Sequence, residues 1–352
     1  MVARMHQELE EDDETALVEA DAQNPAGSFA LPERLTVPAA STGERLDKAL
    51  ARLLPEVSRS RIKQWIEGGA IRLNDRTPAA RTQVFAGDTI DLAPPPSPEA
   101  SAFVAEPIAL DVVHADDAIL VLDKPPGLVV HPAAGNWSGT LLNGLLAYDP
   151  RQGLLPRGGI VHRLDAGTSG LMVVARTAPA YLDLVRQLQA RSVTREYWAL
   201  VYGAAPKEGT IDAAIARDPR QPLRFKVSRA PAAKPARTHY RTVETSDAAG
   251  QALSWLVCRL ETGRTHQIRV HLESIGLPLV GDPVYRRGRP GSDASLATAW
   301  TRFARQALHA CRLGLIHPVT GEPTQWFREP PGDMRELMTS LGFHLRRRAG
   351  SV

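Results

Sequence analysis

The sequence lacks the features that mark membrane and secreted proteins. Its 352 residues contain no apolar run near the ~20 residues that a membrane-spanning helix requires. The first residues, MVARMHQELEEDDE, lack the apolar core of a secretory signal. Only Cys258 and Cys311 occur, so neither a disulfide framework nor a cysteine zinc site is predicted. These absences predict a cytoplasmic protein with no membrane partner.

Glycine-rich phosphate loops of the P-loop or Rossmann kind are also missing, which argues against ATP, GTP or NAD as a substrate. A metal site is not indicated either. His266 and His271 are five residues apart, and this spacing does not align two ligands on one helical face. Cys258 has no second cysteine near it in the sequence. We therefore expect no cofactor and no metal.

Charge is unevenly distributed along the chain. The formal net charge is +3, but residues 1–21 hold eight acids against Arg4 alone, so the remainder carries a clear positive excess. A basic body favours a polyanionic partner. We interpret residues 1–33 as an acidic, disordered, solubilising tail. The alternative is that this tail competes with the polyanion for the basic surface.

A compact unit is predicted at residues 43–92. Apolar spacing predicts a helix over Glu44–Leu54, and Ser58 is a suitable N-cap for a second helix that ends at Gly68-Gly69. Two short strands should follow at Ala70–Leu73 and Gly87–Leu92, with a turn at Asn74-Asp75.

The second helix of this unit carries Arg59, Arg61 and Lys63 close to its N-terminal turn, where a phosphate would also meet free backbone N–H groups. The stretch ERLDKALARLLPEVSRSRIKQWIEGGAIRLNDR resembles the S4 RNA-binding fold. The resemblance implies that these three side chains contact RNA. The alternative is an ordinary solvated basic helix face.

A proline-rich linker over residues 93–107 separates this unit from one α+β domain at residues 108–345. Short β-type runs predict strands at Leu110–Val113, Ile119–Leu122, Leu128–Val130, Leu171–Val174, Trp198–Val201 and Ser254–Leu260. Helical patterns lie at Leu141–Leu146 and Ala180–Ala190.

The most informative segment of this domain is GIVHRLDAGTSGLMVVAR, residues 159–176. Asp165 precedes a loop of small residues, and the apolar strand Leu171–Ala175 comes next. A carboxylate on a loop that enters a buried strand is held rigidly while its oxygens can face a cleft. The alternative is that Asp165 simply pairs with Arg163 to close the loop.

HRLD followed by a small loop and TSG resembles the signature of the pseudouridine synthases of the RluA type. Five further blocks resemble the same family, in the family's order: LDKPPGLVVHPAAGN, REYWALVYG, LETGRTHQIRVHL, GDPVY and QALHACRLGLIHPVTGE. The resemblance implies an α+β fold with mixed, mainly antiparallel sheets around a central cleft, preceded by a small S4-like α/β domain. One departure is Ala166-Gly167, where the family usually has a charged or polar pair.

The resemblance also implies a chemistry and residues to perform it. Pseudouridine synthases break the bond between uracil N1 and ribose C1′, turn the base, and join C1′ to C5. Asp165 matches the catalytic aspartate, which acts as nucleophile or as base. Arg269 matches the arginine that pairs with this aspartate, and the alternative for it is a surface or structural arginine. Tyr197 matches the tyrosine that stacks on uracil near C5, and core packing is its alternative.

Three further residues match positions that contact RNA in the family. Arg163 matches the arginine that enters the RNA stack when the target base flips out. Arg264 and His266 are expected to contact phosphates or to anchor their loop.

Within the family, the HPAAGN block, the Arg229–Arg241 stretch and the S4-like unit most resemble members that act on large-subunit ribosomal RNA. This implies 23S rRNA or a large-subunit precursor as partner, with the helix 69 stem-loop as target, and a monomeric enzyme. Two alternatives remain open: a sister synthase for other rRNA uridines, and a non-catalytic RNA-binding protein of ribosome assembly.

Overall fold

The computed structural model describes residues 32–55, 57–94, 102–133, 135–248, 250–285 and 303–344. The chain divides into two compact units, with the boundary between Ala102 and Phe103. Most of the predicted acidic tail and of the proline-rich linker lies outside the described residues.

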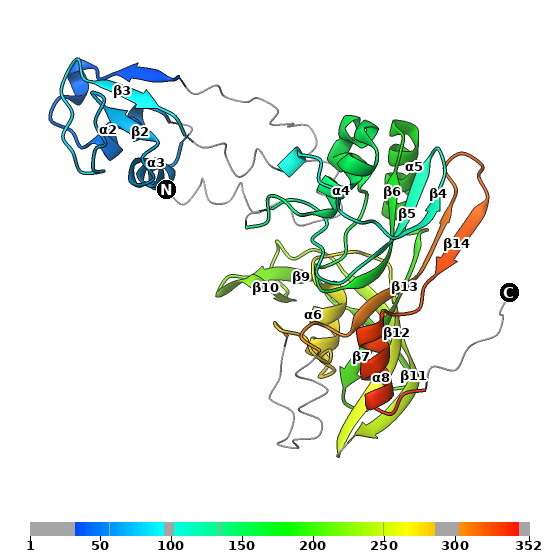
Figure 1. Cartoon of the computed structure of the whole chain (residues 1–352). Coiled ribbons are helices and arrows are strands. Elements are labelled where there is room, and N and C mark those ends of the chain that lie inside the picture. The colour runs from blue at the N-terminus through cyan, green and yellow to red at the C-terminus, as the bar shows by residue number, and fades with distance from the viewer. Residues whose placement is uncertain are drawn as a thin grey trace. The chain divides into compact units, whose positions relative to one another are not determined.

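The first unit is a small α/β module whose elements are drawn in blue and cyan in Figure 1. Its elements are β1 (Arg34–Thr36), the 3-10 helix η2 (Ala39–Ser41), α2 (Leu46–Leu53), α3 (Arg59–Glu67), β2 (Ile71–Leu73) and β3 (Thr89–Leu92). The strands form an antiparallel sheet in the order β1-β3-β2. The two helices and two strands predicted here are therefore confirmed, with slightly shorter bounds.

Local signals explain the bounds of these elements. Helix α3 begins after Ser58, whose hydroxyl accepts a hydrogen bond from the Arg61 N–H at 3.3 Å. Asn74 and Asp75 both adopt positive φ, 48° and 62°, as the predicted turn requires. The apolar faces of α2 and α3 pack with the strands around Leu50, Ile62 and Ile90.

The second unit combines one large sheet, a separate two-stranded hairpin and several helices. Its strands are β4 (Val112–Ala115), β5 (Ile119–Lys124), β6 (Ser169–Ala175), β7 (Thr194–Tyr202), β8 (Glu208–Asp212), β9 (Ile215–Asp218), β10 (Gln221–Val227), β11 (Arg237–Ala248), β12 (Gln251–Leu260), β13 (Leu308–Ile316) and β14 (Pro323–Phe327). Its helices are α4 (Leu141–Tyr148), η4 (Pro150–Leu154), η5 (Pro156–Gly159), α5 (Ala178–Gln189), α6 (Gln267–Ser274) and α8 (Gly332–Ser340).

Within the described residues, the large sheet runs in the order β4-β5-β6-β13-β7-β12-β11-β8, and β14 pairs with β13. Its pairs are antiparallel except for β13 with β6, so the sheet is mixed and mainly antiparallel as expected. A separate hairpin, β9–β10, lies beside α6 (Figure 1).

Strands β5 and β6 are buried on both faces, which explains their continuous apolar sequences. Alternate side chains of a strand point to opposite faces. Leu122 and Met172 accordingly pack in the cluster that contains α4, whereas Val121 and Val173 pack in the cluster that contains α5. Helix α8 covers another part of the sheet, against Leu200 of β7 and Leu253 of β12.

The predicted strand at Leu128–Val130 is wrong. The carbonyls of Val129 and Val130 accept hydrogen bonds from the first N–H groups of α4, at 2.8 and 3.1 Å, and the Leu128 carbonyl accepts one from Lys124. The carbonyls of this segment therefore accept hydrogen bonds from the start of α4 and from Lys124, not from a neighbouring strand.

The residues just after Ala102 also differ from expectation. Asn143 of α4 donates a side-chain hydrogen bond to the Val104 carbonyl, and the Glu106 N–H donates to the Asn143 carbonyl. Residues 103–107, assigned to the linker from their sequence, are therefore attached to the second unit.

Candidate active site

An open pocket, with about 600 Å³ of empty space when the adjoining solvent is included, lies on the second unit. One wall is the loop before β6, which contributes Arg163, Leu164, Asp165 and Thr168. Another is the 263–269 segment, which leads into α6. Tyr197, Leu260 and Leu308 contribute from the strands β7, β12 and β13. The loop that carries Asp165 and the segment that leads into α6 therefore meet in one concave site.

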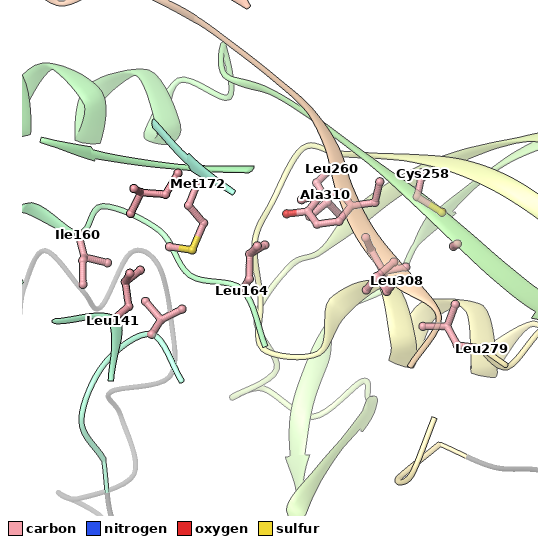
Figure 2. Packing of buried hydrophobic residues seen from close by; sticks show 14 of the residues in the cluster. Leu141, Ile160, Leu164, Met172, Cys258, Leu260, Leu279, Leu308 and Ala310 are labelled. Carbon is pink, nitrogen blue, oxygen red and sulfur yellow. The ribbon is translucent and has the colours of Figure 1, made fainter. Parts of the chain in front are cut away.

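Leu164 fixes the orientation of the loop that carries Asp165. Its side chain is buried in the main core cluster, and Figure 2 shows it between Met172 on one side and Leu308 on the other. The Asp165 carbonyl accepts a hydrogen bond from the Thr168 N–H at 2.9 Å, which closes the turn. With Leu164 held in the core, Arg163 and Asp165 both line the pocket.

Arg269 joins Asp165 to a second carboxylate. Its Nη1 donates to Asp165 Oδ2 at 2.9 Å, and its Nε and Nη2 donate to the two oxygens of Asp282 at 2.8 and 3.0 Å. The arginine side chain is only 4% exposed and that of Asp282 is fully buried. The expected pairing of Asp165 with Arg269 is thus present, and the reading of Arg269 as a surface residue is wrong.

The Asp165 carboxyl is ionised at neutral pH. Burial by itself raises its pKa, but His266 in its protonated form, the positive charge of Arg269 and the hydrogen bond from Arg269 lower it below the usual value. Burial also lowers the pKa of His266, so this ring is neutral at pH 7. We therefore assign the cation beside Asp165 to Arg269.

Tyr285 packs against the guanidinium group of Arg269, and no role was predicted for it from the sequence. The Arg269 guanidinium lies 4.9 Å from the centre of its ring, a cation–π contact. Its hydroxyl oxygen lies 2.9 Å from His266 Nδ1 and accepts a hydrogen bond from the Phe225 N–H. Asp282 and Tyr285 both belong to the GDPVY block, so a signal for them was present, but it did not say what they contact.

Tyr197 is both a core residue and part of the pocket wall. It is 6% exposed and belongs to the main core cluster, yet it also lines the pocket next to Leu260 and Leu308. Its neighbours across the sheet are Cys258 of β12 and Ala310 of β13. The ring is therefore a rigid part of the pocket wall.

Arg163 and Arg264 both line the pocket. Arg163 is exposed. Arg264 ties its loop to the segment before β11, because its Nε donates to the Pro235 carbonyl at 3.1 Å, and its backbone N–H donates to the side chain of Gln267. The expectation of a loop anchor describes Arg264 well.

Lys124 supports the Asp165 loop from below the surface. It is 1% exposed, and its ammonium group donates to the carbonyls of Pro125, Leu128 and Ala166 at 2.9, 2.9 and 3.0 Å. Burial lowers its pKa to about 7, and Asp165 opposes that shift. Three carbonyl acceptors match the three donors of an ammonium group, which favours the charged form. No role was predicted for this lysine from the sequence, although it lies in the LDKPPG block.

Ala166 and Gly167 replace the charged or polar pair that is usual in the family, and their backbone carbonyls make the contacts of this part of the loop. The Ala166 carbonyl also accepts from the Gly127 N–H at 2.7 Å, and the Gly167 carbonyl accepts from Arg305 at 3.0 Å. A Cβ atom at Gly167 would lie 2.6 Å from the side-chain oxygen of Gln306. The small residue therefore leaves room for Gln306, which donates to Thr168.

In the first unit, the basic side chains of α3 are arranged as the sequence predicts. Lys63 is exposed and lies 3.6 Å from Glu67, and Arg61 is half-buried. Arg59 is also exposed, but it pairs with the buried carboxylate of Asp47 at 2.8 Å. Arg59 thus has a structural contact in addition to the expected one with RNA.

Among the described residues, no group of three or more histidine, cysteine or acidic side chains is arranged to hold a metal ion. None of the helices in these ranges combines the length and the apolar character that crossing a bilayer requires.

Comparisons with known proteins agree across both units. A family model described as RNA pseudouridylate synthase matches residues 118–274, and the S4 domain model matches residues 44–90. The chain is 49% identical over 308 residues to ribosomal large subunit pseudouridine synthase D of Neisseria meningitidis serogroup A, covering 87% of this chain and 81% of that protein. The synthase D of Escherichia coli O6:H1 is 47% identical over 307 residues, covering 86% and 92%.

A solved structure shows the same fold. Human RNA pseudouridylate synthase domain containing 4 aligns with a TM-score of 0.50 and 25% identity, covering 66% of this chain and 92% of the human one. The human domain containing 1 aligns with a TM-score of 0.49 and 27% identity, covering 68% and 86%.

Proposed function

Because this chain belongs to the RNA pseudouridylate synthase family, we propose that it converts uridine to pseudouridine in large-subunit ribosomal RNA, with Asp165 as the reacting carboxylate. The single observation that carries the role of Asp165 is its position: an ionised, mostly buried carboxylate paired with Arg269 in a pocket that is also lined by Tyr197. The S4 domain and the names of the relatives support ribosomal RNA as the substrate.

The reaction needs only groups that this pocket contains. The N1–C1′ bond breaks and its electron pair stays with the uracil ring. The ring turns, C5 bonds to C1′, C5 loses its proton and N1 gains one. The product is an isomer of the substrate, so neither an oxidant nor an energy source is consumed. Asp165 serves either as the nucleophile or as a base in this sequence, and Tyr197 faces the base where the C5 proton leaves.

The structural neighbours of Asp165 keep its carboxylate ionised, which either role requires. Asp282 holds two donors of the Arg269 guanidinium, which leaves Nη1 directed at Asp165. A carboxylate in a dry site otherwise loses its charge, since burial raises its pKa. Exposed Arg163 is suited to fill the place of the flipped uridine in the RNA stack.

Replacement of Asp165 by Asn tests this assignment. The amide conserves shape but supplies neither a nucleophile nor a base, so turnover should be lost while folding and RNA affinity persist. Tritium release from RNA labelled at uridine C5 measures turnover, and filter binding measures affinity. Asp117→Asn, an exposed aspartate between β4 and β5, is the matched control and should behave as wild type. Turnover of Asp165→Asn within about tenfold of wild type would refute the proposed role.

For the target, we propose the helix 69 stem-loop, and a sister synthase with other target uridines is the alternative. Mapping pseudouridines in rRNA from cells that lack this protein distinguishes the two. Loss confined to helix 69 supports the proposal, whereas loss elsewhere supports the sister activity. The alternative of a non-catalytic assembly factor is disfavoured because Asp165, Tyr197 and Arg269 meet in one pocket.

A further inference from the structure

The hydroxyl group of Tyr285 determines where the proton of His266 lies. Tyr285 is fully buried, and its oxygen accepts a hydrogen bond from the Phe225 N–H at 2.9 Å. Its other hydrogen-bond partner within the described residues is His266 Nδ1, also at 2.9 Å. A buried hydroxyl proton without an acceptor is costly. The phenol therefore donates to His266 Nδ1, and this nitrogen carries no proton.

His266 is also uncharged at neutral pH. Burial lowers its pKa, and the charges of Arg269 and Arg163 act in the same direction, while Asp165 and Asp282 oppose them. Burial raises the pKa of Tyr285 to about 12, so the phenol keeps its proton. A neutral imidazole with an accepting Nδ1 must carry its proton on Nε2.

The Nε2–H group belongs to a residue that lines the pocket. It lies 4.0 Å from Asp165 Oδ1, which is too far for a hydrogen bond, and it makes no other hydrogen bond within the described residues. Phe225 meets the imidazole edge to face, with 5.8 Å between the ring centres. The backbone of His266 is left-handed, with φ of 56°, at the residue before α6. The ring is thus held from several sides as a fixed, neutral donor beside Asp165.

We propose that His266 Nε2–H donates a hydrogen bond to a carbonyl oxygen of the target uracil, and that Tyr285 is the positioning residue that keeps the proton on Nε2. This inference rests on the proposed isomerisation and deepens it. When the N1–C1′ bond breaks, the electron pair that stays with uracil spreads onto its carbonyl oxygens. A fixed donor at such an oxygen binds the transition state more tightly than the substrate.

Because His266 is neutral, the uracil base is a better hydrogen-bond acceptor for it than the phosphate that the sequence predicted. A phosphate is best bound by a cation, whereas His266 is neutral. Its Nε2 also faces the reacting carboxylate, where the base must lie for Asp165 to act. Arg163, which lines the same pocket, is the better phosphate or stacking partner.

Two substitutions of His266 test the donor. Gln places an N–H near the position of Nε2, whereas Asn reaches only as far as Nδ1 and tolerates left-handed backbone well. We expect His266→Asn to lower kcat by roughly 100-fold, as the loss of one such donor does, with KM for the RNA little changed. His266→Gln should recover a large part of that loss. Wild-type kcat in His266→Asn, or no recovery in a folded His266→Gln, would overturn the proposal.

Nitrogen NMR of protein labelled at histidine tests the tautomer without any RNA. The wild-type His266 should show a protonated Nε2 and a bare Nδ1 at pH 7. Tyr285→Phe keeps the ring beneath Arg269 but removes the hydroxyl, so the preference for this tautomer should weaken and kcat should fall while KM holds. A protonated Nδ1 in the wild type, or an unchanged tautomer and kcat in Tyr285→Phe, would contradict the positioning role.

These results are separable from those for Asp165. If Asp165→Asn is inactive while His266→Asn turns over normally, the isomerisation proposal stands and the donor proposal falls. If Asp165→Asn turns over normally, the role proposed for Asp165 fails, and if the wild type releases no tritium the proposed function itself fails.

Discussion

The guanidinium group of Arg269 bridges two carboxylates, Asp282 with two donors and Asp165 with one. A buried arginine of this kind needs its geometry as much as its charge, because its planar fork matches a carboxylate with two parallel hydrogen bonds. The contact of its face with Tyr285 adds a further constraint. Asp282 thus positions Arg269, and Arg269 positions Asp165.

Substitution of Arg269 should affect both stability and activity. Arg269→Ala leaves two carboxylates without their cation, which typically costs roughly 3–5 kcal/mol when the pair is buried. Arg269→Lys should recover only part of this, since an ammonium cannot serve both carboxylates with the same geometry. Urea unfolding and tritium release measure the two effects. Normal turnover with unchanged unfolding free energy in both variants would mean that the pairing is unimportant.

Lys124 should matter for stability although it does not line the pocket. Lys124→Met keeps the stem but leaves the Pro125 and Leu128 carbonyls without this donor, at a typical cost of roughly 1–3 kcal/mol for each unsatisfied group, while the Ala166 carbonyl retains its hydrogen bond from the Gly127 N–H. We expect a clear fall in melting temperature and, because Ala166 follows Asp165, a lower kcat. Lys207→Met, at an exposed lysine, is the control. Equal melting temperatures for Lys124→Met and wild type would contradict this account.

At the scale of elements, Asp149 links the end of α4 to the end of β6. It caps α4 and accepts hydrogen bonds from Arg151 at 2.8 Å and from Arg176, just after β6, at 3.1 Å. The hydrogen bonds from Arg151, together with those from Arg176, hold the pKa of Asp149 well below its usual value despite partial burial. Helix α4 packs on one face of β5 and β6, so this link helps to hold that layer in place.

The depressed pKa gives the stability contribution of Asp149 a defined pH dependence. The contribution is fully present above the unfolded-state pKa, about 4, and is lost as the pH falls through the lower folded-state pKa. We expect Asp149→Asn to lower the unfolding free energy by roughly 1.5–3 kcal/mol at pH 7.

Its difference from wild type should shrink as the pH falls below about 4, as measured by urea unfolding across a pH series. The control is Asp183, whose Oδ1 lies 3.4 Å from Nη2 of the exposed Arg186. Asp183→Asn should show little effect at any pH. A difference that is constant with pH would show that Asp149 acts through packing and not through its charge.

At the scale of the whole molecule, we expect the two compact units to divide the work of binding and chemistry. Every residue assigned to the pocket belongs to the second unit, and the basic helix α3 belongs to the first. A chain that begins at residue 102 retains the contacts of Val104 and Glu106 with Asn143 and loses only the first unit and what precedes it.

The shortened chain should still isomerise uridine but with a raised KM and a flatter salt dependence. Each phosphate contact that is lost, for example at Arg61 or Lys63, should reduce the salt slope by roughly one unit. Steady-state kinetics on a helix 69 fragment at two ionic strengths measure both, with an Arg61→Ala, Lys63→Ala double variant of the full chain as a matched comparison. Equal KM values and equal salt slopes for all three proteins would show that the S4 domain does not hold this RNA.

The sequence by itself determined the elements whose signals are local. The apolar runs at Ile119–Leu122 and Leu171–Val174 became two strands buried on both faces, and the Ser58 cap and the Asn74-Asp75 turn lie where predicted. Periodicity, caps and turns act over a few residues, so they are readable without the fold. The run at Leu128–Val130 failed because its carbonyls are used by α4 and Lys124, which no local pattern reveals.

Apart from the pairing of Asp165 with Arg269, which the family resemblance implied, only the tertiary structure decided which side chains meet. Asp165 and Arg269 are 104 positions apart, and their contact depends on the loop before β6 lying against the start of α6. The roles of Asp282, Tyr285 and Lys124 were hidden for the same reason, although their sequence blocks were visible. The tautomer of His266 is set by a hydroxyl and a backbone N–H from two other segments. Hydrogen bonds of this kind depend on distances between remote parts of the chain, and those distances exist only once the sheet has formed.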